Sequence, residues 1–249
     1  MNSLPSREGQ PVPQVTFRYR KDGEWQETDS HRLFDNRTVA VFSLPGAFTP
    51  TCSSTHLPRF NELAPAFWQN GVDEIVCISV NDPFVMEEWA KSQECANVFV
   101  LPDGNGSFTE QMGMLVDKSD LNFGKRSWRY SMLVRNGTIE RMFIEPDEPG
   151  DPFKVSDADT LLRYVNKDAK EPDQIALLTR QGCVFCAKAK KLLDDAKIVY
   201  AEVDLPHTVR TRALGAIAKA RTVPQMFVNG ELIGGSDEVE RWVAEHRTA

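Results

Sequence analysis

Short apolar runs separated by turn residues dominate the first two thirds of the chain. A helix-like segment at residues 83–95 lies between two of these runs. The last run continues through Asn136-Gly137 into residues 138–144, and Asn-Gly between apolar runs is a strong signal for a β-hairpin. The strand-like runs are residues 39–44, 74–80, 98–101 and 130–134. Strands that alternate with helices and close on a hairpin predict an α/β layered fold with a mixed sheet.

The pattern starts again after a polar stretch. Residues 166–173 contain a proline and no apolar periodicity, which predicts a linker between a first domain at 1–165 and a second at 174–249. The second domain is predicted to contain strand 175–179, a helix from 183 to about 196, strand 198–203, helix 209–219, strand 225–228, the turn Asn229-Gly230, strand 231–233 and a helix from 237. This βαβαββα order describes a complete small domain.

Composition limits the classes of function. Hydrophobic residues make up 41% and charged residues 26% of the 249 residues, which is ordinary for a globular protein. No apolar run approaches the ~20 residues of a membrane span, and residues 1–15 lack the apolar stretch of a secretory signal. We therefore expect a cytoplasmic protein with no membrane partner.

The charge is divided unevenly along the chain. Residues 174–249 carry 11 Lys+Arg against 9 Asp+Glu, which leaves 18 against 27 for residues 1–173 and gives the whole chain a net charge of -7. Nucleic acid is not expected as a partner, because neutralising phosphates requires a clustered basic face. The asymmetry favours two separate units.

Five cysteines, an odd number, do not suggest a disulfide-stapled secreted domain. Cys77 lies within the apolar run 75–78 and is predicted to fill the core. Cys95 ends the helix-like segment, and no catalytic role is expected for it. The remaining three, Cys52, Cys183 and Cys186, are candidates for chemistry.

Cys183 and Cys186 form a C-x-x-C motif between a predicted strand and a predicted helix. The first sulfur of such a motif lies at the helix N-terminus, where free N–H groups and the helix dipole stabilise a thiolate. The second sulfur lies one turn further in. A zinc site is the alternative, but zinc requires a second ligand pair, and the domain has only the widely separated His207 and His246.

Three segments of the second domain together resemble a glutaredoxin, and the resemblance spans residues 174–249. They are Thr179-Arg180-Gln181-Gly182-Cys183-Val184-Phe185-Cys186, Thr222-Val223-Pro224 and Gly234-Gly235-Ser236-Asp237. The resemblance implies a glutathione site: a loop around a cis Pro224 in which Thr222 and Val223 meet the peptide, and Gly235, Ser236 and Asp237 at its γ-glutamyl end. Arg180 matches a basic residue that could pair with the glycyl carboxylate. Val184 and Phe185 replace the proline and tyrosine that are common in the family.

Cys52 follows a Gly/Pro turn and begins a predicted helix, in a neighbourhood of Thr, Pro and Ser that is polar rather than core-like. Pro45, Thr49 and Cys52 match the signature Pro-x-x-x-Thr-x-x-Cys, and residues 10–165 resemble a peroxiredoxin of the Prx5 type. The resemblance implies an arginine on a later strand that faces the sulfur. Arg129 matches this position, with Arg126 as a rival.

The chemistry of peroxide cleavage explains why these residue types belong together. It needs a thiolate, a donor that orients the peroxide and a positive charge beside the leaving oxygen. Cys52 would supply the thiolate, Thr49 and the Cys52 N–H would orient the peroxide, and Arg129 would stabilise charge. Pro45 would shield the pocket from water. No metal or permanently bound cofactor is required.

The two resemblances imply two thioredoxin-like domains that act in sequence. We expect a glutathione-dependent peroxidase in which Cys52 reduces hydrogen peroxide and alkyl hydroperoxides and is then glutathionylated. Cys183 would remove the glutathionyl group, and a second glutathione would release it. We also expect a homo-oligomer, a dimer or tetramer. The alternatives are a redox sensor acting on a binding partner and a protein deglutathionylase that uses the first domain for docking.

Overall fold

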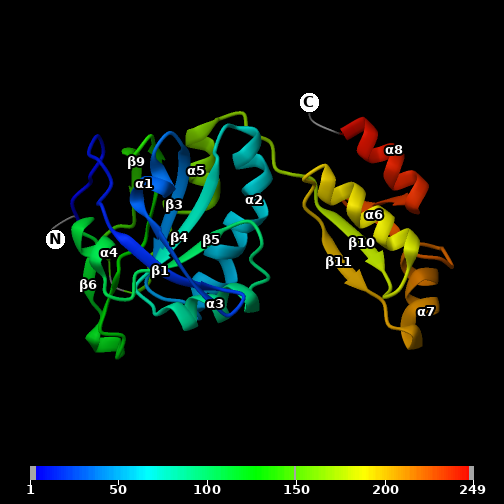
Figure 1. Ribbon diagram of the computed structural model, residues 1–249, viewed down its shortest axis with the longest axis horizontal. Coiled ribbons are helices and arrows are strands. Elements are labelled where there is room, and N and C mark those ends of the chain that lie inside the picture. The colour runs from blue at the N-terminus through cyan, green and yellow to red at the C-terminus, as the bar shows by residue number, and fades with distance from the viewer. Residues whose placement is uncertain (1–3, 149, 247–249) are drawn as a thin grey trace. The chain divides into compact units, whose positions relative to one another are not determined.

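The computed structural model describes residues 4–148 and 150–246, and its chain forms two compact units, the first ending at Glu171 and the second starting at Pro172 (Figure 1). The elements of the first unit are β1 Thr16–Lys21, β2 Glu24–Asp29, α1 Ser30–Phe34, β3 Thr38–Leu44, a π-helical turn Cys52–His56, α2 Leu57–Gln69, β4 Glu74–Ser79, α3 Pro83–Ser92, β5 Phe99–Pro102, α4 Ser107–Gln111, β6 Leu115–Asp117, a 3-10 turn Ser119–Leu121, β7 Lys125–Ser127, β8 Tyr130–Arg135, β9 Thr138–Ile144 and α5 Ala158–Val165.

A five-stranded mixed sheet in the order β5-β4-β3-β8-β9 forms the centre of the first unit. Strands β3, β4 and β5 run parallel, whereas β8 pairs antiparallel with both β3 and β9. The central strand β3 is apolar along nearly its whole length because side chains bury on both faces of the sheet. The predicted β8–β9 hairpin is present, with Asn136 and Gly137 at positive φ in its turn.

Successive residues of β3 point into two different cores. Ala40, Phe42 and Leu44 pack with apolar residues of α2 and α5. Val39 and Val41 face the other side, in a second core that includes residues of β1, α1 and α4. The carboxyl end of β3 therefore delivers the following loop to the region where α2 begins, and this positions Cys52.

The second unit repeats the layered arrangement on a smaller scale. Its elements are β10 Ile175–Thr179, α6 Val184–Asp195, β11 Ala201–Asp204, α7 His207–Ile217, β12 Gln225–Val228, β13 Glu231–Gly234 and α8 Ser236–His246. The strand order is β11-β10-β12-β13, with a parallel first pair and antiparallel others. Helices α6 and α8 cover one face and α7 the other. The predicted fold class, two mixed sheets flanked by helices, is confirmed.

The second strand of this unit begins later than the sequence predicts. Residues 198–200 were expected to be extended, but Ile198 and Tyr200 instead pack against the core below α6. Lys197 adopts a positive φ of 55°, and Ile198 N–H donates to Leu193 O at 3.0 Å, which closes the helix. Apolar residues after a helix therefore serve its C-terminal cap here rather than a strand.

The boundary between the two units, after Glu171, lies within the predicted linker 166–173, and most of that stretch contacts the first unit. The Asn166 side chain donates to Asn70 at 2.7 Å, and Ala169 packs against the core of the first unit. Glu171 forms an ion pair with Arg59 at 3.0 Å. The next residue but one, Asp173, accepts a hydrogen bond from Asn229 in the second unit.

Within the described residues, no helix combines the length and the apolar character that crossing a bilayer requires.

Candidate active sites

Hydrogen bonds to neighbouring elements hold the loop that carries Cys52. The Ala47 N–H donates to Asn81 Oδ1 at 3.0 Å, which ties the loop to the end of β4. Ser53 N–H donates to Thr49 O at 3.0 Å, and the buried Trp89 indole donates to Ser53 Oγ at 2.9 Å. Cys52 itself begins a π-helical turn, a wide turn that is common at functional sites.

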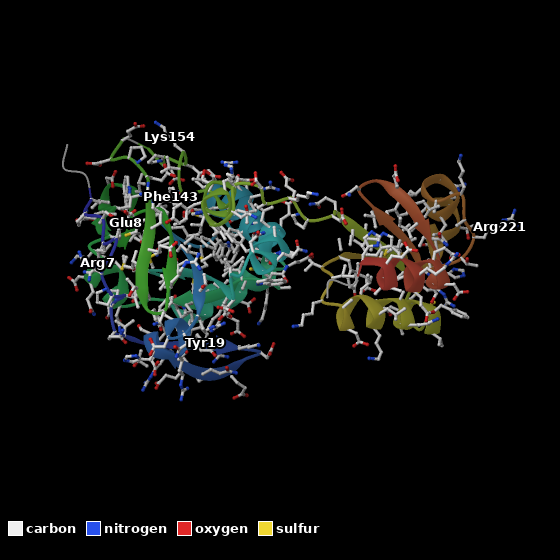
Figure 2. The ribbon with its side chains drawn as sticks, turned by 90° about the horizontal axis from the view of Figure 1, so that it is seen from above. Arg7, Glu8, Tyr19, Phe143, Lys154 and Arg221 are labelled. Atoms are coloured by element: carbon white, nitrogen blue, oxygen red, sulfur yellow. The ribbon has the colours of Figure 1, made fainter. Side chains whose placement is uncertain are left out.

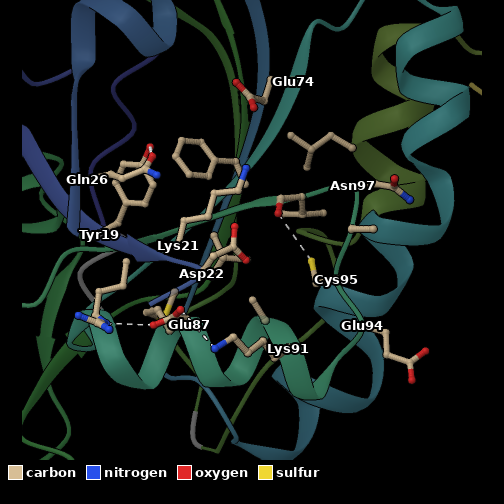
Figure 3. A pocket seen from close by; sticks show the side chains of 18 of the residues that line it. Tyr19, Lys21, Asp22, Gln26, Glu74, Glu87, Lys91, Glu94, Cys95 and Asn97 are labelled. Atoms are coloured by element: carbon tan, nitrogen blue, oxygen red, sulfur yellow. Dashed lines mark hydrogen bonds and ion pairs between the residues drawn. The ribbon is translucent and has the colours of Figure 1, made fainter. Parts of the chain in front are cut away.

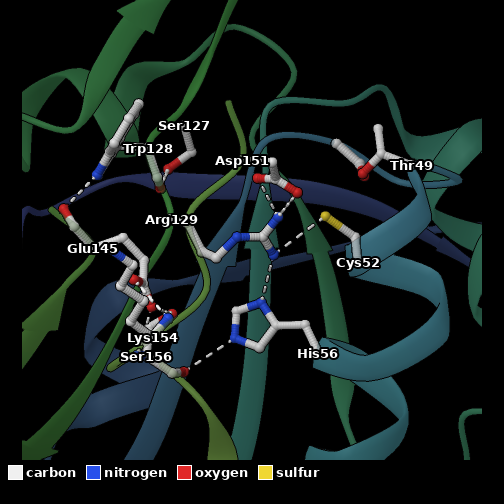
Figure 4. A network of polar contacts seen from close by, with 11 residues as sticks. Thr49, Cys52, His56, Ser127, Trp128, Arg129, Glu145, Asp151, Lys154 and Ser156 are labelled. Atoms are coloured by element: carbon white, nitrogen blue, oxygen red, sulfur yellow. Dashed lines mark hydrogen bonds and ion pairs between the residues drawn. The ribbon is translucent and has the colours of Figure 1, made fainter. Parts of the chain in front are cut away.

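Cys52 is fully buried, at 0% exposure, and belongs to the apolar core beside Phe42 and Leu57. The sulfur therefore packs against apolar side chains and does not lie in the wholly polar neighbourhood that its sequence neighbours indicate. One polar group does reach the sulfur: Arg129 Nη1 donates to Cys52 Sγ at 3.5 Å (Figure 4).

The structure brings Arg129, and not Arg126, to Cys52. Arg126 donates to the carbonyl oxygens of Val80 and Phe123 instead. The Arg129 guanidinium is also buried, and its Nη2 forms two hydrogen bonds of 2.6 Å to the Asp151 carboxylate. Burial disfavours a charged guanidinium, but the negative groups of Cys52 and Asp151 outweigh it and raise the pKa of Arg129. The guanidinium stays charged.

His56 is a residue of this site to which the sequence assigned no role. Burial, together with the charge of Arg129, lowers its pKa to about 3, although a hydrogen bond to Ser156 opposes the shift. The ring is therefore neutral. Because Arg129 can only donate, His56 Nδ1 accepts from Arg129 Nη1 at 3.1 Å, and Nε2 carries the proton and donates to Ser156 O at 3.1 Å. Its position one turn after Cys52 was the available signal.

Thr49 and Pro45 lie in the loop before the cysteine, and both are half-buried. The Thr49 hydroxyl donates to Gly46 O at 2.9 Å. Because its proton is used there, its oxygen is left as an acceptor for a peroxide O–H. A buried thiol, a fixed guanidinium and an acceptor hydroxyl can together bind and cleave an O–O bond.

Cys183 lies at the N-cap of α6, where its sulfur accepts from the Cys186 N–H at 3.2 Å. It is only 8% exposed, and the exposed side chains of the motif are Val184 and Phe185. Burial opposes ionisation, but hydrogen bonds from Cys186 and Phe185 and the charge of Arg180 lower the pKa of Cys183. Burial and the neighbouring Cys183 raise the pKa of Cys186 to about 11. The first thiol is thus the better nucleophile.

All seven residues predicted to bind glutathione line one pocket with Cys183. They are Arg180, Thr222, Val223, Pro224, Gly235, Ser236 and Asp237. The Val223–Pro224 peptide bond is cis, and Cys183 Sγ lies 3.8 Å from Val223 O. Two further arginines of the pocket, Arg210 and Arg221, were not predicted, because neither belongs to a motif. Figure 2 shows Arg221 at the surface of the second unit.

The Ser236 Oγ is buried in this pocket and has no hydrogen-bond partner within the described part of the chain. It lies at the start of α8, where N–H groups favour an anion. A carboxylate bound here would therefore find a hydroxyl donor as well as the helix N-terminus. Across residues 4–148 and 150–246, no group of three His, Cys, Asp or Glu side chains is arranged to hold a metal ion.

The other two cysteines show no sign of activation. Cys77 is buried in β4, and burial raises its pKa well above the usual range. Cys95 lines a broad pocket between the β1–β2 hairpin and α3 (Figure 3), which Cys52 and Arg129 do not line. Burial raises the pKa of Cys95 to about 11, and its thiol contacts Val98 O at 3.7 Å.

Comparisons with known proteins match both units. The Redoxin family matches residues 7–162 and the Glutaredoxin family residues 175–233. The hybrid peroxiredoxin hyPrx5 of Haemophilus influenzae is 56% identical over 241 residues, covering 97% of this chain and 100% of the relative. A peroxiredoxin of Synechocystis is 52% identical over 174 residues, covering 65% of this chain and 92% of its own.

Solved structures resemble the first unit. Reduced Prx3 of Vibrio vulnificus, in complex with hydrogen peroxide, has a TM-score of 0.60 at 36% identity and covers 64% of this chain and 98% of its own. A 1-Cys peroxiredoxin of Plasmodium falciparum has a TM-score of 0.61 at 34% identity and covers 65% and 100%. With the fold, the two thiol sites and the full-length relative in agreement, the chain belongs to the peroxiredoxins, as a hybrid in which a Prx5-type peroxiredoxin domain precedes a glutaredoxin domain.

Proposed function

We propose that this peroxiredoxin is glutathione-dependent and reduces hydrogen peroxide and alkyl hydroperoxides, with its glutaredoxin domain as the reductant of Cys52. The proposal rests on two thiols in one chain. Cys52 is paired with the buried guanidinium of Arg129, and Cys183 lies in a pocket lined by the residues predicted to bind glutathione. The Vibrio relative solved with hydrogen peroxide supports this substrate.

In the first step, the Cys52 thiolate attacks one peroxide oxygen. An S–O bond forms as the O–O bond breaks, so sulfur is oxidised to a sulfenic acid and the second oxygen leaves as hydroxide or alkoxide and takes up a proton. Arg129 stabilises both the thiolate and the charge that develops on the leaving oxygen. Thr49 orients the peroxide by accepting its O–H.

In the second step, glutathione condenses with the sulfenic acid, which releases water and leaves a mixed disulfide on Cys52. The Cys183 thiolate attacks the glutathione sulfur and frees Cys52. A second glutathione then attacks glutathionylated Cys183 and leaves as oxidised glutathione. Because Cys52 is wholly buried, its sulfur must become accessible in both steps, and opening of the turn Cys52–His56, which Trp89 holds through Ser53, would expose it.

Steady-state peroxide consumption, followed through NADPH with glutathione and glutathione reductase and without thioredoxin, tests the proposal. We expect sustained turnover. A redox sensor would oxidise once and then stop. A protein deglutathionylase would act on unrelated mixed disulfides and would lose nothing when Cys52 is replaced. Either result would contradict the fused peroxidase.

A further inference from the structure

A short segment after β9 covers the guanidinium that faces Cys52. Residues 150–156, which we call the strap, contact Arg129 and His56 through three residues, and one of them, Phe153, also packs against the His56 ring at 4.9 Å. Asp151 binds Arg129 Nη2 through both oxygens at 2.6 Å, and the Phe153 ring lies 5.4 Å from the guanidinium carbon. The third residue is Ser156, whose carbonyl oxygen accepts a hydrogen bond from His56 at 3.1 Å. Figure 4 shows Asp151 and Ser156 on either side of the Arg129–His56 pair.

One buried carboxylate anchors the strap. Glu145 Oε1 accepts from the N–H groups of Val155 and Ser156 at 2.9 and 2.8 Å and from the Ser156 hydroxyl at 2.8 Å. Its Oε2 accepts from the Lys154 N–H at 2.8 Å. Its own N–H donates to Arg129 O at 3.1 Å. Glu145 therefore binds the backbone of Arg129 on one side and the backbone of the strap on the other.

We propose that Glu145 and Asp151 are positioning residues for peroxide reduction: Glu145 fixes the strap, and the strap, chiefly through Asp151, aims Arg129 Nη1 at Cys52. The inference rests on the role assigned to Arg129 under the proposed function. A long arginine side chain has many rotamers, and binding Nη2 at one end leaves Nη1 directed at the sulfur. The Asp151 charge also offsets part of the field that Arg129 exerts on Cys52.

The test measures, in the full-length protein, the second-order rate constant for oxidation of Cys52 by hydrogen peroxide. The Cys52 sulfenic acid is trapped with a 1,3-dione, and the Cys52 peptide is quantified. Asp151→Ala should lower the rate constant about tenfold, since one charge-assisted contact is lost. Asp151→Asn keeps an acceptor oxygen and should stay within about threefold. The rate constant is also measured as a function of pH. The acid limb of this pH–rate profile should move to lower pH in Asp151→Asn, because without the negative charge Arg129 favours the Cys52 thiolate more strongly.

Glu145→Gln should also lower the rate constant about tenfold, because its amide would place N–H against the donors of the strap. The matched control is Glu148→Gln, which removes an exposed ion pair with Lys154 on the outer side of the strap. The control should stay within about twofold. Thermal unfolding of each variant shows whether it is folded. If Glu145→Gln is not folded, the variants of Asp151, whose side chain is 43% exposed, decide the result.

Arg129→Ala separates the two levels of the argument. It should lower the rate constant by about 10²-fold or more. If it stays near the wild-type value, the role of Arg129 in the proposed function is wrong. If Arg129→Ala is impaired while Asp151→Ala and Glu145→Gln both stay within about twofold of wild type, the positioning role of the strap is wrong. An acid limb that does not move in Asp151→Asn would contradict the electrostatic part.

Discussion

At the scale of single residues, the peroxidase site combines groups that are unfavourable when taken one at a time. A buried cation and a buried histidine each oppose folding unless they are paired. Here Arg129 is paired with Cys52 and Asp151, and the neutral ring of His56 accepts the remaining Nη1 contact. The site is therefore stable only as a set.

Cys52→Ser should abolish peroxide reduction, by roughly 10³-fold or more, because the hydroxyl that replaces the thiol does not ionise in this pH range. The second unit should still reduce small glutathionyl disulfides, since its thiols are untouched. Both activities are measured with glutathione and its reductase. More than trace peroxidase activity in the variant would show that another cysteine is the nucleophile.

The buried His56 should make the first unit sensitive to acid. Its pKa is lowered from 6.5 to about 3, so between these two pH values the unfolded chain binds a proton at His56 and the folded unit does not. The stability that the neutral His56 contributes to the first unit is fully present above pH 6.5 and is lost as the pH falls toward 3. The free energy of unfolding should fall by about 1.4 kcal/mol per pH unit from this residue alone.

Urea unfolding followed by tryptophan fluorescence, which reports mainly on the first unit because only Trp242 of the five lies in the second, measures this slope. In His56→Gln the slope should be reduced by about 1.4 kcal/mol per pH unit. His31→Gln is the control, since His31 is exposed in an ion pair with Asp35. Equal slopes in His56→Gln and wild type would contradict the prediction.

At the scale of secondary structure, both reactive sulfurs lie where a helical segment begins. Cys52 opens a π-helical turn that continues into α2, and Cys183 caps α6. The N–H dipoles of a helix N-terminus act on a sulfur at the cap, such as Cys183, and their effect fades within one turn, before Cys186. This difference predicts different roles for the two thiols of the second unit.

Cys183→Ser should lower glutathione-driven peroxidase turnover by about 10²-fold or more, whereas Cys186→Ser should keep at least about a third of it. Cys183 is the activated thiol, and a second glutathione can release its glutathionyl group directly. Steady-state rates of the two variants measure this. In a dithiol mechanism Cys186 would be obligatory, so equal and nearly complete losses would overturn the monothiol route.

At the scale of the whole molecule, the connection between the units is shorter than the polar stretch suggests. Because residues up to Glu171 are held on the first unit and Asp173 is held on the second, only Pro172 lies between the two sets of contacts. A flexible eight-residue chain would reach about 28 Å, and a connection this short reaches much less. Reduction of Cys52 by the second unit of another chain does not depend on this short connection.

We therefore predict a dimer or tetramer in which the second unit of one chain reduces Cys52 of another. The acidic first part and slightly basic second part of the chain favour such contacts. Mixing Cys52→Ser chains with Cys183→Ser chains tests the prediction, because each chain lacks the thiol that the other supplies. Recovery of peroxidase activity in mixed oligomers is expected. No recovery would indicate that the second unit reduces Cys52 of its own chain, or that second units act while the chains are dissociated.

Local signals in the sequence were sufficient for much of the fold. The β8–β9 hairpin follows from Asn136-Gly137, and the placement of Cys183 follows from a strand, a turn and a helix that are adjacent in the chain. The β1–β2 hairpin was missed, although Asp22-Gly23 marks its turn, because both strands are largely exposed and too polar to show an apolar pattern. Periodicity detects burial, and a strand that buries little gives a weak signal.

The sequence by itself determined the residues whose role depends on their immediate neighbours. These are the reactive Cys52 and Cys183 at helix starts, and Pro224 after Val223 in the second unit. Only the tertiary structure decided that Cys52 is buried, that Arg129 rather than Arg126 faces it, and that His56, Asp151 and Glu145 complete the site. The reason is physical. Helix and turn signals act over a few residues, whereas Arg129 and Cys52 are 77 positions apart and meet through the packing of β3, β8 and α2.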